Sequence, residues 1–147
     1  MADKQPERDY VLGTHDEEIA RLALQHRVWR PRATDAWRRA GFTEGQTILD
    51  VGCGTGHASL DLAESVGPSG RVVAPDRSRR FLDALEGAQR HRGLANITAH
   101  EIDLDEEALP PGQADAAWSR WVFAFMKRPR DLLDLLPSGA VLVINNT

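Results

Sequence analysis

The sequence predicts an α/β fold, a Rossmann-like parallel sheet with helices on both faces. Short apolar segments recur along the 147 residues at intervals that leave room for a helix between them. A glycine-rich turn directly follows one of these segments and precedes a helical pattern. The content of 41% hydrophobic and 27% charged residues is typical of a globular domain. Because crossovers between parallel strands are right-handed, such a chain covers its sheet with helices.

The expected elements follow from periodicity and from turn residues. We expect strands at residues 47–51, 71–74, 97–102, 114–119 and 140–144, and helices at 57–66, 78–92 and 129–136. Pro75 predicts an early end for the second strand, since proline cannot donate to a sheet ladder.

The segment from His15 to Gly41 has a helical pattern that precedes the first strand. Asp16 is suited to cap a first helix, Pro31 is expected to interrupt it, and a second helix is expected over 32–40. Gly41 suits the left-handed position after a helix end. We therefore predict one domain over 1–147, with an N-terminal helical cap at 1–45 and an α/β core at 46–147.

Charge and composition exclude several classes of protein. The net charge is -4 with basic and acidic residues mixed along the chain, which argues against a nucleic-acid partner. No apolar run approaches the roughly 20 residues that cross a bilayer, so no membrane partner is expected. A single cysteine, Cys53, forms no internal disulfide, and the polar N-terminus lacks a secretory signal. These features favour a cytoplasmic location, and no metal site is expected.

The segment from Asp50 to Gly56 has glycines at every second position between a strand and a helix. A turn of this kind lets the backbone approach a ligand closely, although a tight turn without a ligand explains the same residues. A dinucleotide motif would place its third glycine at position 57, where this chain has His57, and the phosphate-binding lysine motif is missing. The spacing therefore disfavours a nicotinamide-dependent oxidoreductase.

Residues Ile48 to Gly56 resemble the first motif of the class I S-adenosylmethionine-dependent methyltransferases. The resemblance implies S-adenosylmethionine as cofactor, with Asp50 near its amino end. It also implies that the glycine turn passes close to the methionine part. The turn residues concerned are Gly52, Cys53, Gly54 and Gly56.

The same resemblance implies further cofactor contacts at the ends of later strands. Asp76, followed by Arg77, is expected at the ribose hydroxyls, and the alternative is that Asp76 caps the next helix. Ile102 and Asp103 match the adenine contacts, whereas a solvated acidic loop is the alternative for Asp103. Ser119 and the following Arg120 are expected to face the cofactor crevice at the end of the fourth strand.

The N-terminal segment also resembles that of small-molecule methyltransferases, in which it packs over the cofactor. Tyr10 and Gln25 are therefore lid candidates, although a helix that merely covers the sheet is an equal alternative. Methyl transfer needs no fixed catalytic residue, because alignment of donor and acceptor supplies most of the rate. His15 and His57 are the candidate general bases. The signature of nucleic-acid amino-methylating enzymes is absent after the fourth strand, which favours a small-molecule methyl acceptor.

The chain departs from the family pattern near its C-terminus. The connection between Trp118 and Ala140 is short, and the last residue, Thr147, comes before the family's final helix and antiparallel hairpin. An exposed sheet edge is then expected, with a tendency to self-associate. The alternative function is a non-catalytic cofactor-binding module that a partner completes.

Overall fold

The computed structural model describes residues 16–107, 114–120, 126–134, 136 and 140–145. In chain order the elements are α1 (Asp16–Arg39), β1 (Thr47–Val51), α2 (His57–Val66), β2 (Arg71–Asp76), α3 (Arg79–His91), β3 (Ile97–Glu101), β4 (Ala116–Arg120), α4 (Pro129–Leu133) and β5 (Val141–Asn145). No described helix is both long enough and apolar enough to cross a membrane.

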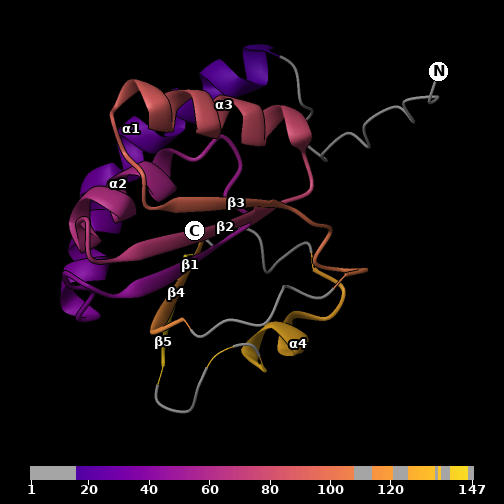
Figure 1. Ribbon diagram of the computed structural model, residues 1–147. Coiled ribbons are helices and arrows are strands. Elements are labelled where there is room, and N and C mark those ends of the chain that lie inside the picture. The colour runs from indigo at the N-terminus through magenta and orange to yellow at the C-terminus, as the bar shows by residue number, and fades with distance from the viewer. Residues whose placement is uncertain (1–15, 108–113, 121–125, 135, 137–139, 146–147) are drawn as a thin grey trace.

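The sheet has five strands in the order β3-β2-β1-β4-β5, and every pairing is parallel. The α/β class predicted from the sequence is therefore confirmed. The chain moves outward from β1 to β3 and then returns to the other side of β1 at β4 (Figure 1). This reversal places a crevice at the carboxyl ends of β1 and β4, which is where open α/β sheets bind ligands.

Each face of the sheet has its own hydrophobic core. Helices α1, α2 and α3 lie on one side, and the short α4 lies on the other (Figure 1). The core under α1 to α3 includes Trp37 and Trp118, whose rings meet edge to face with centroids 5.3 Å apart. Buried residues of the opposite core include Val51, Ile102 and Ala117. Alternate residues of β4 thus face opposite layers, and this alternation sets the side of the sheet on which each side chain at the end of β4 lies.

The expected break at Pro31 is wrong, because α1 is one continuous helix with Pro31 inside it. Proline removes one intrahelical hydrogen bond, and Pro31 lies on the exposed side, where water can hydrate the freed carbonyl. The helix is held on both sides of the proline by buried His26 and Trp37. Asp16 is the first helical residue, and Gly41 adopts the expected positive φ, 85°.

The expected early end of β2 is also wrong, because β2 continues through Pro75 to Asp76. The Pro75 carbonyl accepts a hydrogen bond from Cys53 N at 3.1 Å, so that edge of the residue faces the glycine turn. The N–H and C=O of one strand residue point to the same side, so the N–H that Pro75 lacks would also point toward β1. The pairing of β2 with β1 ends at Val73, before Pro75. The ladder between β2 and β3 therefore loses no donor.

The ends of the other elements lie close to those predicted. Strand β1 and helix α2 match the expected residues, and α3 begins after its N-cap Ser78. Helix α4 is shorter than expected and ends at Leu133.

Gly56 offers a test of how tightly the glycine turn is packed. It has a φ of 85°, and a Cβ there would lie 2.9 Å from Leu85 Cβ and collide with Leu85 Cδ1. Leu85 is fully buried and cannot move aside. We expect Gly56→Ala to lower the unfolding free energy by about 2–5 kcal/mol.

The control is Gly87→Ala on α3, where a new Cβ meets no atom within 4 Å. Since alanine is the better helix former, this variant should be about 0.5–1 kcal/mol more stable than the parent. Chemical denaturation of both variants measures the two effects. Equal stability of Gly56→Ala and the parent would contradict the packing described here.

Candidate functional site

The glycine turn between β1 and α2 is built from residues with left-handed backbone. Gly52, Gly54 and Gly56 have φ values of 64°, 58° and 85°, a region that other residues rarely adopt. A Cβ on Gly54 would meet no protein atom within 4 Å. The turn therefore presents a bare, open backbone surface at the end of β1.

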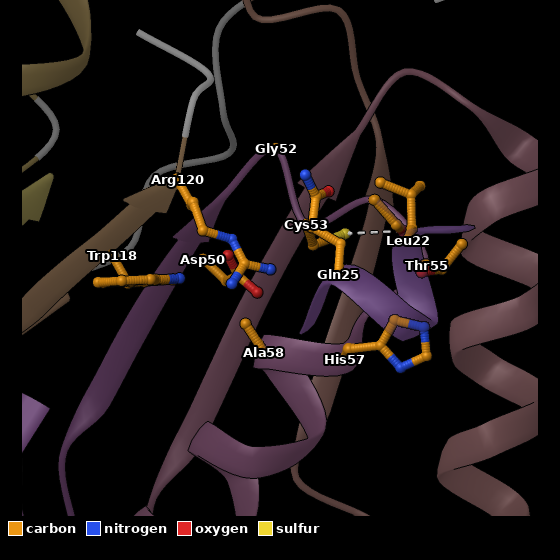
Figure 2. A pocket seen from close by; sticks show the side chains of 11 residues that line it. Leu22, Gln25, Asp50, Gly52, Cys53, Thr55, His57, Ala58, Trp118 and Arg120 are labelled. Carbon is orange, nitrogen blue, oxygen red and sulfur yellow. Dashed lines mark hydrogen bonds between the residues drawn. The ribbon is translucent and has the colours of Figure 1, made fainter. Parts of the chain in front are cut away.

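A pocket lies at this turn, between the carboxyl ends of β1 and β4 and the inner side of α1 (Figure 2). Its lining joins residues from α1, the turn, α2 and β4. These residues are Leu22, Gln25, Asp50, Gly52, Cys53, Gly54, Thr55, His57, Ala58, Trp118 and Arg120. The structure thus brings several predicted residues together in one cavity, namely Gln25, Asp50, Gly52, Cys53, Gly54, His57 and Arg120.

Asp50 is the acidic group of the pocket and is only 3% exposed. Its Oδ2 accepts a hydrogen bond from Ser59 Oγ at 2.5 Å. Burial raises the pKa of Asp50 to about 6, although the bond from Ser59 and the charge of Arg120 oppose this shift. At neutral pH the pocket therefore holds a carboxylate that water solvates poorly, an environment that favours a cationic ligand group.

Arg120 is the basic residue of the pocket, on the side of the crevice that the sequence predicts for it. It is the last residue of β4, and its guanidinium group lies beside the Asp50 carboxylate (Figure 2). Its Nη2 is 3.5 Å from His26 Nδ1. Burial lowers the pKa of Arg120, and the charge of Asp50 opposes that change. A pocket with both charges at its base can bind a ligand that itself carries both charges.

A buried polar cluster lies behind the pocket and links α1 to α2. His26 Nε2 is 2.7 Å from Asp61 Oδ2, and Arg30 Nε lies 3.1 Å from the same oxygen. Burial alone would raise the pKa of Asp61, but the His26 hydrogen bond and the nearby arginine charges lower it. His26 has the spacing of an apolar helix face, so only the tertiary contact with Asp61 shows its polar role.

His57, a candidate base, stacks on His26 with ring centroids 5.6 Å apart. Burial lowers the pKa of His57, so the ring is neutral at neutral pH. Among the described residues its buried Nε2 has no hydrogen-bond partner. His57 thus forms part of the pocket wall, and its basic role stays a prediction.

Asp76 holds the glycine turn against the end of β2. Its Oδ2 accepts a hydrogen bond from Gly54 N at 2.8 Å, and its Oδ1 accepts one from Ser78 N at 3.0 Å. The cap of α3 is Ser78, whose Oγ accepts from Phe81 N at 3.2 Å. The alternative that Asp76 is the helix cap is therefore wrong. Burial raises the pKa of Asp76 to about 6, and the Ser78 and Gly54 amides oppose the shift.

The remaining candidates lie along the strand ends but outside this pocket. Ile102 is buried in the opposite core, and its N–H donates to the Asp76 carbonyl at 2.9 Å. Asp103 Oδ1 accepts from Asp105 N at 3.0 Å in the following loop, and Arg77 is half-buried after β2. Ser119 alternates with Trp118, so it faces the layer opposite the pocket. Its buried Oγ has no partner among the described residues.

Two predicted residues, Tyr10 and His15, lie outside the described part of the chain. Their roles as lid and base stay predictions. Gly56 does not line the pocket, and it serves as the N-cap of α2.

The chain is similar to known proteins both in sequence and in fold. The family model described as "Methyltransferase domain" matches residues 48–136. Demethylmenaquinone methyltransferase of Lactococcus lactis subsp. lactis (strain IL1403) is 40% identical over 73 residues, which are 50% of this chain and 28% of that protein. The 2-phytyl-1,4-naphtoquinone methyltransferase of Nostoc sp. (strain PCC 7120) is 36% identical over 74% of this chain and 47% of its own length.

Among solved structures, a SAM-dependent methyltransferase from Aquifex aeolicus superposes with a TM-score of 0.68 and 25% identity. The match covers 76% of this chain and 61% of that one. The chain therefore spans less than half the length of these two curated relatives.

The hydrogen bonds of Asp76 predict a large effect on stability. Asp76→Ala leaves the buried amides of Gly54 and Ser78 without their acceptors, at about 1–3 kcal/mol each. Water that enters the vacated space reduces the penalty. We expect a loss of about 2–4 kcal/mol in unfolding free energy, measured by urea denaturation. Asp76→Asn keeps one acceptor oxygen and should lose less, so equal losses in both variants would contradict this arrangement.

The raised pKa of Asp50 predicts a pH dependence of stability. The folded chain holds its Asp50 proton up to about pH 6, whereas the unfolded chain releases it near 3.8. The folded state therefore binds more protons between these values, and its stability falls as the pH rises through them. We expect Asp50 to contribute a decrease of about 1–3 kcal/mol across this window.

Asp50→Asn keeps the acceptor for Ser59 and removes the titration. Denaturation at intervals from pH 4 to 7 should therefore show a shallower fall for Asp50→Asn than for the parent. The exposed Asp83→Asn is the control and should keep the parent's slope. An unchanged slope in Asp50→Asn would show that this carboxyl titrates normally.

Proposed function

Since this chain belongs to the family of S-adenosylmethionine-dependent methyltransferase domains, we propose that its pocket receives the amino-acid end of that cofactor for methyl transfer to a small molecule. The observation that carries the proposal is the pairing of the buried Asp50 carboxylate with an open glycine turn in one cavity. The Asp50 carboxylate offers a partner for an ammonium group, and the glycine turn leaves space for the ligand to approach the backbone closely.

The residues around the turn fit the cofactor. The space above Gly54 is open, and Asp50 is ionised above about pH 6. The Asp76 carboxylate accepts backbone amides of Gly54 and Ser78, and Asp76 is the proposed neighbour of the ribose hydroxyls. Ile102 and Asp103, at the end of β3, are the proposed neighbours of the adenine. We further propose Arg77 and Ser119 as neighbours of the cofactor at the ends of β2 and β4.

When bound, S-adenosylmethionine supplies a sulfonium methyl group for transfer to a nucleophile. The chain's own part is to fix the donor through Asp50 and the glycine turn and to exclude water with the apolar wall of Leu22, Ala58 and Trp118. We propose His57 as the proton acceptor, because it is neutral and borders the cavity.

The proposed acceptor class is a quinone. The names of the Lactococcus and Nostoc relatives describe methyltransferases of a demethylmenaquinone and a naphthoquinone. Their identity to this chain of 40% and 36% supports the same class of acceptor here.

The alternative is a cofactor-binding module that a partner completes. Within the described residues, β5 forms the outer edge of the sheet and leaves Val141 and Ile144 41% and 44% exposed. A strand edge of this kind can pair with a further strand. Cofactor binding without turnover on a quinone acceptor favours this alternative, and turnover excludes it.

Binding of S-adenosylhomocysteine tests the cofactor directly. A ligand that binds only the folded state stabilises it by about 2.7 kcal/mol at one hundred times its dissociation constant. We expect a rise in unfolding temperature with S-adenosylhomocysteine and none with NAD. The reverse pattern would overturn the proposal.

Gly54→Val tests whether the open turn receives the ligand. The valine side chain would occupy the space above the turn, and we expect it to abolish S-adenosylhomocysteine binding in calorimetric titration. Gly41→Val is the matched control, because Gly41 also has a positive φ of 85° and open space but lies outside the pocket. Both variants carry a similar backbone strain, so a loss of binding in Gly54→Val alone identifies the site. Unchanged affinity in Gly54→Val would show that the turn is purely structural.

A further inference from the structure

The pocket contains one acidic and one basic group, Asp50 and Arg120, on adjacent strands. Asp50 projects from β1 and Arg120 from the end of β4, on the sheet face that α1 and α2 cover (Figure 2). An α-amino acid is a zwitterion whose ammonium and carboxylate groups are attached to the same carbon. The two opposite charges of the pocket thus correspond to the two charges of an amino-acid headgroup.

On the basis of the function proposed above, we propose that Arg120 binds the α-carboxylate of the cofactor's amino-acid end while Asp50 binds its ammonium group. The guanidinium fork of arginine matches a carboxylate in shape and can donate two parallel hydrogen bonds to it. Arg120 is therefore a residue that positions the donor and selects a zwitterionic ligand.

Arg120 is the cation suited to this task among the residues that line the pocket. Arg30 and Arg92 both approach Asp61, on the other side of His26 and away from the cavity. His57 lines the cavity, but burial lowers its pKa and leaves it neutral. A carboxylate that enters the pocket therefore meets one permanent positive charge.

The cluster behind the pocket orients this guanidinium. His26 Nε2 lies 2.7 Å from an Asp61 carboxylate oxygen, which can only accept, so the Nε2 atom carries the proton. Arg120 Nη2 lies 3.5 Å from His26 Nδ1 and can only donate, so the tautomer that satisfies both contacts has Nδ1 as the acceptor. Asp61 thus sets the tautomer of His26, and His26 sets the direction of Arg120.

Ligand binding would also rearrange the charges of the pocket favourably. Without ligand, Asp50 and Arg120 interact with each other, and both are desolvated. A zwitterion replaces this contact by two ion pairs, one at each residue. The gain depends on the carboxylate of the ligand, and this dependence can be measured with two ligands that differ in that group alone.

The test is calorimetric titration of the full chain with S-adenosylhomocysteine and with its decarboxylated analogue, 5′-deoxy-5′-(3-aminopropylthio)adenosine. Both ligands keep the ammonium group. The parent chain should bind the analogue roughly ten to one hundred times more weakly, the effect of losing charge-assisted hydrogen bonds. Equal affinity of the parent for the two ligands would overturn the proposal without any variant.

The variant Arg120→Gln tests whether Arg120 is the residue that binds the carboxylate. It should weaken S-adenosylhomocysteine binding by roughly ten- to one-hundredfold and analogue binding by less than about threefold. Arg120→Lys keeps the charge but not the fork, and its S-adenosylhomocysteine affinity should lie between those of the parent and Arg120→Gln. Equal losses for both ligands in Arg120→Gln would show that Arg120 only supports the pocket structure.

Arg38→Gln is the control, because it removes a guanidinium of α1 that pairs with Asp35, outside both the pocket lining and the cluster behind it. Its affinities for both ligands should equal those of the parent. If the parent chain does not bind S-adenosylhomocysteine at all, the proposed function itself is contradicted. If the parent binds both ligands equally well, only the role of Arg120 at the carboxylate is contradicted.

Discussion

The hydrogen bond from Gly54 N to the Asp76 carboxylate holds the site together. This bond and the bond from Cys53 N to the Pro75 carbonyl tie the glycine turn to the end of β2. Because the turn is fixed there, α2 begins at His57 and Ser59 reaches the Asp50 carboxylate. The position of the pocket, its open backbone and its acidic group all follow from this one attachment.

The burial of carboxyl groups at this site costs free energy in the ligand-free chain, and this cost favours ligand binding. Folding buries two carboxyl groups at the strand ends, and burial raises the pKa of both Asp50 and Asp76 to about 6. Near neutral pH both are charged without full solvation, which destabilises the ligand-free chain. A ligand that brings an ammonium group and hydroxyl donors relieves this cost. Sites of this kind are expected to be less stable empty than bound, because their groups are arranged for a ligand.

Local patterns in the sequence predicted the strands and the glycine turn, because strand periodicity and left-handed turns are properties of neighbouring residues. The interpretation failed at Pro31 and Pro75, where the effect of proline depends on which way its missing N–H points in the folded chain. The polar contacts of His26 and Arg120 were missed for a related reason. Their partners, Asp61 and His26, are 35 and 94 residues away in the sequence, so no local spacing reveals these contacts.

The role of Gln25 illustrates how these distant contacts decide function. The sequence left two alternatives open for Gln25, a lid over the cofactor or a helix that only covers the sheet. In the structure Gln25 lines the pocket from α1, and the neighbouring residue His26 is joined to Asp61 on α2. Farther along α1, Trp37 packs edge to face on Trp118 of β4. A helix with buried contacts to two other elements does not open and close independently. This part of α1 is therefore held in place as a wall of the pocket, and the lid role of Gln25 stays a prediction.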